Sequence, residues 1–268
     1  MNKEQDYISI FLEPIRKCKD YKPKFGESQN EQGVSLENFL QLYSTDPFYA
    51  WIGLDNRLMY AAHKAAGGMT SIYRQIGIGC EYLFREILAD MAQYENKEFV
   101  RWSYTTKTNT GKEKTLSLDG RLGYTDIQNN ELIFRLKGWV ENYCKELSVQ
   151  QLPSNGVVFE VRQGYKSKDS KRQNADIDNA VVAWANGYLP IFSIFSSQID
   201  SDILLRYRNN RCGILIGNQS NNPLISLFSF SNQVLGYNLA GFFERNSTVF
   251  KSEVNSVLMT LLNPYGND

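Results

Sequence analysis

Histidine is almost absent from this chain of 268 residues, since His63 is the only one. This excludes a catalytic triad with a histidine base and a metal site built from several histidines. The four cysteines, Cys18, Cys80, Cys144 and Cys212, lie far apart and form no CxxC pair. Their spacing predicts neither a zinc site nor a disulfide framework, and we expect reduced, buried thiols. Any catalytic metal would then be held by carboxylates, which favours a hard ion such as Mg²⁺.

The chain also lacks an excess of charge of either sign and any long hydrophobic run. Lys plus Arg and Asp plus Glu number 29 each, so the net charge is zero. A polyanionic partner would therefore need a local concentration of basic residues. No stretch approaches the roughly 20 apolar residues that span a bilayer, so no membrane partner is expected. The first residues, MNKEQDYISIFLEPIRK, contain acidic residues and no apolar signal segment. We expect a cytoplasmic, prokaryotic protein.

What is present indicates a globular α/β protein with an ample core, because hydrophobic residues make up 42% and charged residues 22%. Apolar periodicity predicts helices within 36–66 and over 70–94, 131–149, 167–187 and 200–208, and strands over 99–106, 112–120, 121–127, 156–164, 189–197 and 212–217. Continuous apolar strands that alternate with helices predict a mixed central sheet flanked by helices on both faces.

Two glycines suggest a boundary in this order of elements. Gly67 and Gly68 are expected to break the chain, and Thr70 or Ser71 to cap the helix that follows. We therefore predict a helical arm or extension over 1–66 and a core over 67–268 that forms one compact unit. The four tryptophans, Trp51, Trp102, Trp139 and Trp184, are expected in the core.

Two acidic residues and one basic residue form the candidate catalytic group. Asp119 ends the strand TLSLD directly before a glycine, and Glu160 lies inside the strand GVVFEVRQG. Because strand side chains alternate, Glu160 and Arg162 share one face of the sheet. A carboxylate inside such a strand is costly unless it is paired or bound to a cation. Two carboxylates on neighbouring strands can share one or two Mg²⁺ ions. The alternative, a purely structural Glu–Arg ion pair, remains open.

A run of basic and amide side chains follows the second strand. The segment YKSKDSKRQNAD contains the candidate DNA-binding residues Lys168, Lys171, Arg172, Gln173 and Asn174, with Lys166 before them. Such side chains suit phosphates and base edges. Neighbouring aspartates partly cancel the charge, so an ordinary solvated helix start is the alternative. The segment ILLRYRNNR, with Arg206 and Arg208, offers further candidates for base contacts.

The order of these elements resembles the PD-(D/E)xK nuclease superfamily, which includes most type II restriction endonucleases. The strings TSIYRQIGIGCE and FEVRQGYKSKDSKRQNADI further resemble the ApaLI-like restriction endonucleases, over roughly residues 70–240. The resemblance implies a restriction-endonuclease-like fold. It also implies site-specific, Mg²⁺-dependent hydrolysis of phosphodiester bonds in double-stranded DNA.

The same resemblance implies a role for each candidate residue. Asp119 and Glu160 would be the metal ligands, and Glu81 an accessory carboxylate. Arg162 stands where the motif has a lysine, and arginine stays protonated and cannot act as a base. Arg162 would hold a water or a phosphate oxygen, or Lys166 would complete the site instead.

Palindromic DNA is naturally bound by a two-fold symmetric protein, so the same interpretation predicts a homodimer. Segment 36–66 or the C-terminal segment is expected at its interface. Three alternatives remain: a repair or junction nuclease of the same fold, a non-catalytic nucleic-acid-binding or protein-binding module, and an enzyme acting on small phosphorylated molecules. The last lacks a phosphate-binding glycine loop in this sequence.

Overall fold

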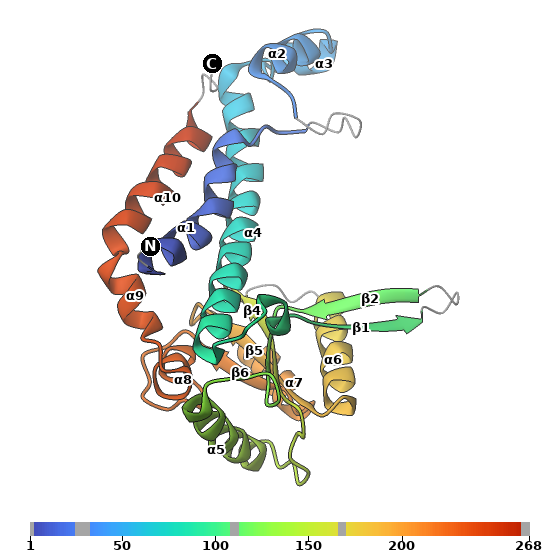
Figure 1. Cartoon of the computed structure of the whole chain (residues 1–268). Helices are drawn as coiled ribbons and strands as arrows, with labels where there is room; N and C mark the ends of the chain where they lie inside the picture. Colours follow the sequence, from blue (N-terminus) through green and yellow to red (C-terminus); the bar gives the residue numbers. More distant parts are fainter. Residues whose placement is uncertain (1–2, 25–32, 108–112, 166–169, 264–268) are drawn as a thin grey trace. The chain divides into compact units, whose positions relative to one another are not determined.

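The computed structural model describes residues 3–24, 33–107, 113–165 and 170–263 (Figure 1). The chain divides into two compact units. Unit 1 comprises Met1–Gly79 and Arg245–Asp268, and unit 2 comprises Cys80–Glu244. One helix, α4 (Arg57–Ala92), contributes residues to both. The predicted boundary between residues 66 and 67 stays a prediction. Within the described residues, no helix is long and apolar enough to cross a membrane.

Unit 1 is helical. Besides the first part of α4, it contains α1 (Lys3–Arg16), η1 (Lys17–Asp20), α2 (Leu36–Ser44), α3 (Pro47–Trp51) and α10 (Ser247–Leu262). Helices α1 and α10 pack against each other, with the Phe11 and Phe250 rings 5.3 Å apart between centroids. The Ser35 side chain caps α2 and the Asp46 side chain caps α3, so each of these helices begins at a residue that accepts from its free backbone N–H groups.

Helix α4 runs without interruption through Gly67 and Gly68, so the predicted break at these glycines and the predicted cap at Thr70 or Ser71 are wrong. The glycines serve close packing within unit 1. A Cβ atom on Gly67 would meet the Tyr21 hydroxyl at 1.9 Å, and one on Gly68 would meet the Leu261 side chain at 2.8 Å. Gly79 follows the same principle, because its Cβ would lie 2.5 Å from the Phe11 carbonyl oxygen. The packing contacts offset the helix-propensity cost of the glycines.

Unit 2 contains the sheets. The strands are β1 (Trp102–Lys107), β2 (Glu113–Leu118), β3 (Gly120–Gly123), β4 (Gly156–Arg162), β5 (Tyr188–Ile194) and β6 (Gly213–Ile216). An antiparallel pair joins β1 and β2, and a four-stranded sheet has the order β3-β4-β5-β6. In this sheet β3 is antiparallel to β4, whereas β4, β5 and β6 are mutually parallel. The mixed α/β class predicted from the sequence is confirmed.

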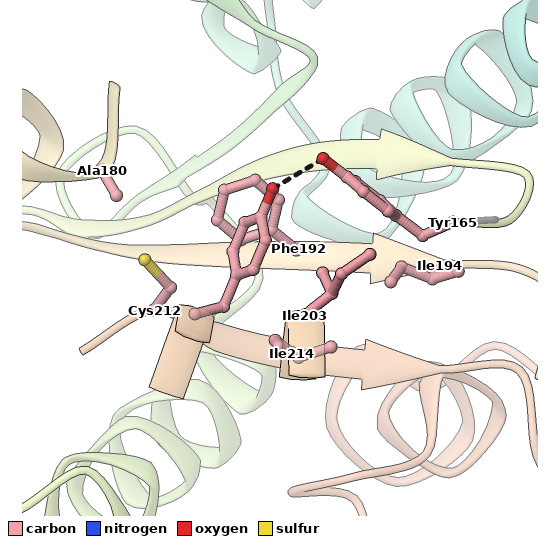
Figure 2. Close-up of a cluster of buried hydrophobic side chains, with 8 residues drawn as sticks. Tyr165, Ala180, Phe192, Ile194, Ile203, Cys212 and Ile214 are labelled. Carbon is pink, nitrogen blue, oxygen red and sulfur yellow. Dashed lines mark hydrogen bonds between the residues drawn. The ribbon is translucent and has the colours of Figure 1, made fainter. Parts of the chain in front are cut away.

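The remaining elements of unit 2 are η2 (Lys97–Val100), α5 (Asn130–Glu146), α6 (Ser170–Ala185), α7 (Ser201–Asn209), α8 (Leu227–Phe230), η3 (Ser231–Leu235) and α9 (Leu239–Arg245), the last ending at the unit boundary. Helices α6 and α7 cover the face of the sheet that carries Phe192 and Ile194, where a buried cluster forms around Tyr207 (Figure 2). Phe159 points the other way and contacts Phe84 of α4 and Phe230 of α8.

The positions of the cysteines and tryptophans test two further predictions. All four cysteines are free and buried, as predicted. Trp139 is buried, but Trp51 at the end of α3 is 83% exposed, so its predicted place in the core is wrong. Helix α3 is only five residues long and its hydrophobic residues include no buried one. Its aromatic composition therefore indicates a surface rather than a core element.

Candidate active site

Asp119 lies where β2 ends and β3 begins, directly beside β4. The antiparallel register pairs Gly120 with Phe159, so the next step of the ladder brings Asp119 opposite Glu160. The Asp119 Oδ2 atom accepts a hydrogen bond of 2.8 Å from the Val161 backbone N–H. Two carboxylates far apart in the sequence thus meet at the end of β4. This end is also the carboxyl end of the parallel strands, where α/β sheets commonly bind ligands.

Arg162 is held between two carboxylates on the α6 face of β4. Its Nη1 atom pairs with Glu160 Oε1, and its Nη2 atom donates to Asp176 Oδ1 of α6 at 3.0 Å. The Arg162 and Asp176 side chains are only 15% and 4% exposed. The Nε atom of Arg162 is buried and has no hydrogen-bond partner among the described residues. One donor of the guanidinium therefore stays without a partner in this part of the described chain, which is uncommon for a buried polar atom.

Two tyrosines complete the surroundings of Asp176. Its Oδ2 atom accepts from the Tyr207 hydroxyl at 2.7 Å and from the Tyr165 hydroxyl at 3.2 Å. The two hydroxyl oxygens are 2.9 Å apart, and Figure 2 marks this hydrogen bond of Tyr165 by a dashed line. Burial and the Asp176 carboxylate raise the pKa of Tyr207, so this hydroxyl stays a donor. Asp176 is thus fixed from α7 and from the segment after β4, and it fixes Arg162 in turn.

Helix α4 brings a second ion pair to Asp119. Glu81 and Arg85, one turn apart, pair with each other, and the Arg85 Nε atom donates to the Asp119 carbonyl oxygen at 2.8 Å. The Glu81 carboxylate lies close enough to raise the pKa of Asp119. The structure thus places Glu81 close to Asp119.

Both central carboxyl groups bind protons more tightly than usual. Burial and the nearby Glu81 carboxylate raise the pKa of Asp119 to about 6. Burial and the Asp119 carboxylate raise the pKa of Glu160 to about 8, although Arg162 opposes the shift. Because each carboxylate destabilises the ionised form of the other, the pair is electrostatically suited to a cation.

The donor set fits Mg²⁺. Four carboxylates and two guanidinium groups gather here, leaving two negative charges when all are ionised: Glu81, Asp119, Glu160, Asp176, Arg85 and Arg162. Magnesium is usually held by one or two carboxylates, with water and substrate phosphates as further ligands. Among the described residues, no group of three His, Cys, Asp or Glu side chains has metal-binding geometry. The predicted role of Asp119 and Glu160 as metal ligands stays a prediction.

The structure uses several of the proposed DNA-binding residues to join α6 to α7. Arg206 donates to the side-chain oxygens of Gln173, at 2.6 Å, and of Asn174. Gln173 is buried, whereas Lys171, Arg172 and Arg208 are exposed. Lys166 and Lys168 lie outside the described residues. The proposed contacts of all these residues with DNA stay predictions.

Sequence reasoning did not identify Asp176, Arg85, Tyr165 or Tyr207 as parts of this group. A signal for Asp176 was present. The buried residues of α6 recur at helical spacing: Gln173, Asp176, Ala180 and Ala183. An aspartate on the buried face of an amphipathic helix requires a partner. No comparable signal marks Tyr165 or Tyr207, because a tyrosine in a hydrophobic context indicates packing first.

Comparison of the chain with protein-family models, with curated proteins and with solved structures gave no match. What this site does must therefore be argued from its own geometry.

Proposed function

We propose that this protein is a Mg²⁺-dependent endonuclease that hydrolyses phosphodiester bonds in double-stranded DNA at a specific site, with a restriction-endonuclease-like fold. The observation that carries the proposal is the pair formed by the partly buried Asp119 and the buried Glu160 at the end of β4. The Glu81 carboxylate raises the pKa of Asp119, and the Asp119 carboxylate raises the pKa of Glu160. The guanidinium of Arg162 pairs with Glu160. Two carboxylates that hold a metal ion, with one positively charged side chain beside them, can support metal-assisted phosphodiester hydrolysis.

Each side chain has a distinct task in this proposal. Asp119 and Glu160 would hold Mg²⁺, which when bound lowers the pKa of a bound water and neutralises charge on the phosphate. Arg162 stays protonated, so it serves as a hydrogen-bond donor to a phosphate oxygen and not as a base. Lys166 remains the alternative residue for this position.

The exposed basic residues at the start of α6, Lys171 and Arg172, would contact the phosphate backbone close to the site. The amide and guanidinium side chains of α6 and α7 would contact the base edges. Cutting both strands of a palindromic site would use two copies of the chain related by two-fold symmetry.

The test is incubation of purified protein with large, mixed plasmid or phage DNA in Mg²⁺ and in EDTA. Discrete fragments are expected in Mg²⁺ only. Asp119→Asn and Glu160→Gln should each lower the cleavage rate by about 100-fold or more, because each weakens the binding of the Mg²⁺ that neutralises charge on the phosphate. Glu141→Gln is the matched control, because Glu141 is an exposed carboxylate of α5. Absence of cleavage on diverse, unmodified DNA would contradict the proposal.

One observation favours a second candidate, a non-catalytic nucleic-acid-binding module. Glu160 is already paired with Arg162, and Arg162 with Asp176, which is the pattern of a structural ion-pair network. This candidate predicts that Glu160→Gln leaves DNA binding unchanged and that no cleavage occurs under any cation.

A further inference from the structure

Large hydrophobic side chains are unusually exposed in one short stretch of unit 1. Trp51 is 83% exposed, Leu58 75% and Phe48 60%. Six exposed large hydrophobics fall within residues 42–58: Leu42, Phe48, Tyr49, Trp51, Ile52 and Leu58. We call them the α2–α3 surface. Isolated exposed hydrophobics are normal, but a dense group marks an interaction site.

The three elements that carry the α2–α3 surface adjoin one another. Helices α2 and α3 pack together, with the Tyr43 and Tyr49 rings stacked at 4.8 Å. Helix α4 begins six residues after α3 ends, and Figure 1 shows α2 and α3 beside its first turns. The Asp46 cap fixes the start of α3 by accepting from the Phe48 and Tyr49 backbone N–H groups. The exposed side chains therefore stand on ordered helices and not on a loose loop.

The area of the α2–α3 surface approaches that of a standard dimer interface. A large aromatic side chain offers about 150–250 Å². The six side chains, which are 37% to 83% exposed, therefore present roughly 600–700 Å². A standard interface buries about 800 Å² per partner.

The charges within residues 42–58 point to a second copy as the occupant. They comprise only Asp46, Asp55 and Arg57. A surface with both signs can be self-complementary across a two-fold axis, and a chain of zero net charge does not repel its own copy. The stretch has no cluster of basic residues, which anionic lipid or DNA would require.

We propose that the α2–α3 surface is the interface through which two copies of this chain associate. The inference names the dimer surface of the proposed function, and it rests on observations that do not involve the carboxylate site. The six side chains of one copy pack against the same six of the other, as a two-fold interface requires.

The test is sedimentation of the full chain over a wide range of concentrations, without DNA and without metal. A dimer is expected for the wild type. Trp51→Glu and Leu58→Glu should each raise the dissociation constant at least about 30-fold, because each places a charge twice at an apolar interface. Both side chains are exposed, so the fold is retained, and the far-UV spectrum checks this.

The matched control is Phe134→Glu, because Phe134 is 81% exposed on α5 of unit 2 and far from residues 42–58 in sequence. It should leave the dimer intact. A monomeric wild type, an unchanged dimer in both Glu variants, or equal dissociation by Phe134→Glu would overturn the inference. If a monomer bound liposomes or DNA and this binding required Trp51, the surface would belong to another partner, and the inference would be overturned as well. The assay contains neither DNA nor metal, so a negative result for dimerisation does not contradict the proposed nuclease activity. Conversely, a dimer that cuts no DNA would contradict the nuclease proposal but not this inference.

Discussion

Arg162 forms the structural ion pair that sequence reasoning left open as one alternative, and the proposed function would give it a second task. Two of its nitrogens bind Glu160 and Asp176, and its buried Nε atom has no partner among the described residues. A lysine could not bridge two carboxylates in this manner, because its ammonium group lacks the planar fork of the guanidinium. An arginine at the position of the motif lysine therefore forms a structural bridge between two buried carboxylates.

Replacing Arg162 by alanine should destabilise the fold strongly. The change leaves the buried Glu160 and Asp176 carboxylates facing each other without a cation. Loss of one partner of a buried ion pair costs about 3 kcal/mol or more. Denaturation in urea at neutral pH measures the free energy of unfolding.

Arg101→Ala is the matched control for this prediction, because Arg101 forms an exposed pair with Glu98. The loss of stability should be at most about 1 kcal/mol for such a pair. Equal effects of the two substitutions would mean that the Arg162 network adds nothing beyond a surface ion pair.

At the scale of elements, α6 connects the carboxylate site to the rest of the α6–α7 layer. Asp176, on its buried face, fixes Arg162, and Gln173, one turn earlier, binds Arg206 of α7. The exposed face of the same first turns carries Lys171 and Arg172. Because Asp176 and the two basic residues lie on α6, the helix sets the distance of the basic residues from the carboxylate site.

Tyr207→Phe tests whether α7 positions Arg162 through Asp176. The variant keeps the ring that packs on Phe192 at 4.5 Å but removes the hydroxyl that donates to Asp176. We expect a stability loss of about 1 kcal/mol, as for one buried hydrogen bond. The cleavage rate in Mg²⁺ should fall about 10-fold, because Arg162 loses its support.

The matched control for Tyr207→Phe is Tyr143→Phe, which removes another buried hydroxyl, bonded to the Ile214 backbone. It should cost similar stability without changing the cleavage rate. If both variants cleave equally well, Tyr207 has a structural role only.

Most elements of unit 2 were predictable because their patterns are local. Apolar periodicity predicts the strand GVVFEVR and the helix after it, and the alternation of strand side chains places Glu160 and Arg162 on one face. The course of α4 through Gly67 and Gly68 was not predictable, because the reason for those glycines is packing against Tyr21 and Leu261. Those contacts join residues far apart in the sequence.

At the scale of the whole molecule, zero net charge conceals local differences. Carboxylates outnumber guanidinium groups beside β4, and the first turn of α6 carries the exposed Lys171 and Arg172. Composition could not reveal this, because it depends on which chain segments meet. A DNA-cutting protein needs both regions, one for a metal and one for phosphates.

The central claim is that the Asp119–Glu160 pair requires a cation, and unfolding free energy measured against pH with and without Mg²⁺ tests it most directly. Because the folded-state pKa of Glu160 is raised from 4.5 to about 8, its stabilising contribution is complete below pH 4.5 and is lost as the pH rises towards 8. The loss approaches about 1.4 kcal/mol per pH unit at most.

We predict that Mg²⁺ restores stability to the wild type near pH 8, where Asp119 is ionised and Glu160 is losing its proton, because the cation binds the two carboxylates in the folded state only. In Glu160→Gln, the decline with pH should be shallower and the effect of Mg²⁺ should be absent. Equal responses of the two proteins to Mg²⁺ at pH 8 would contradict the account.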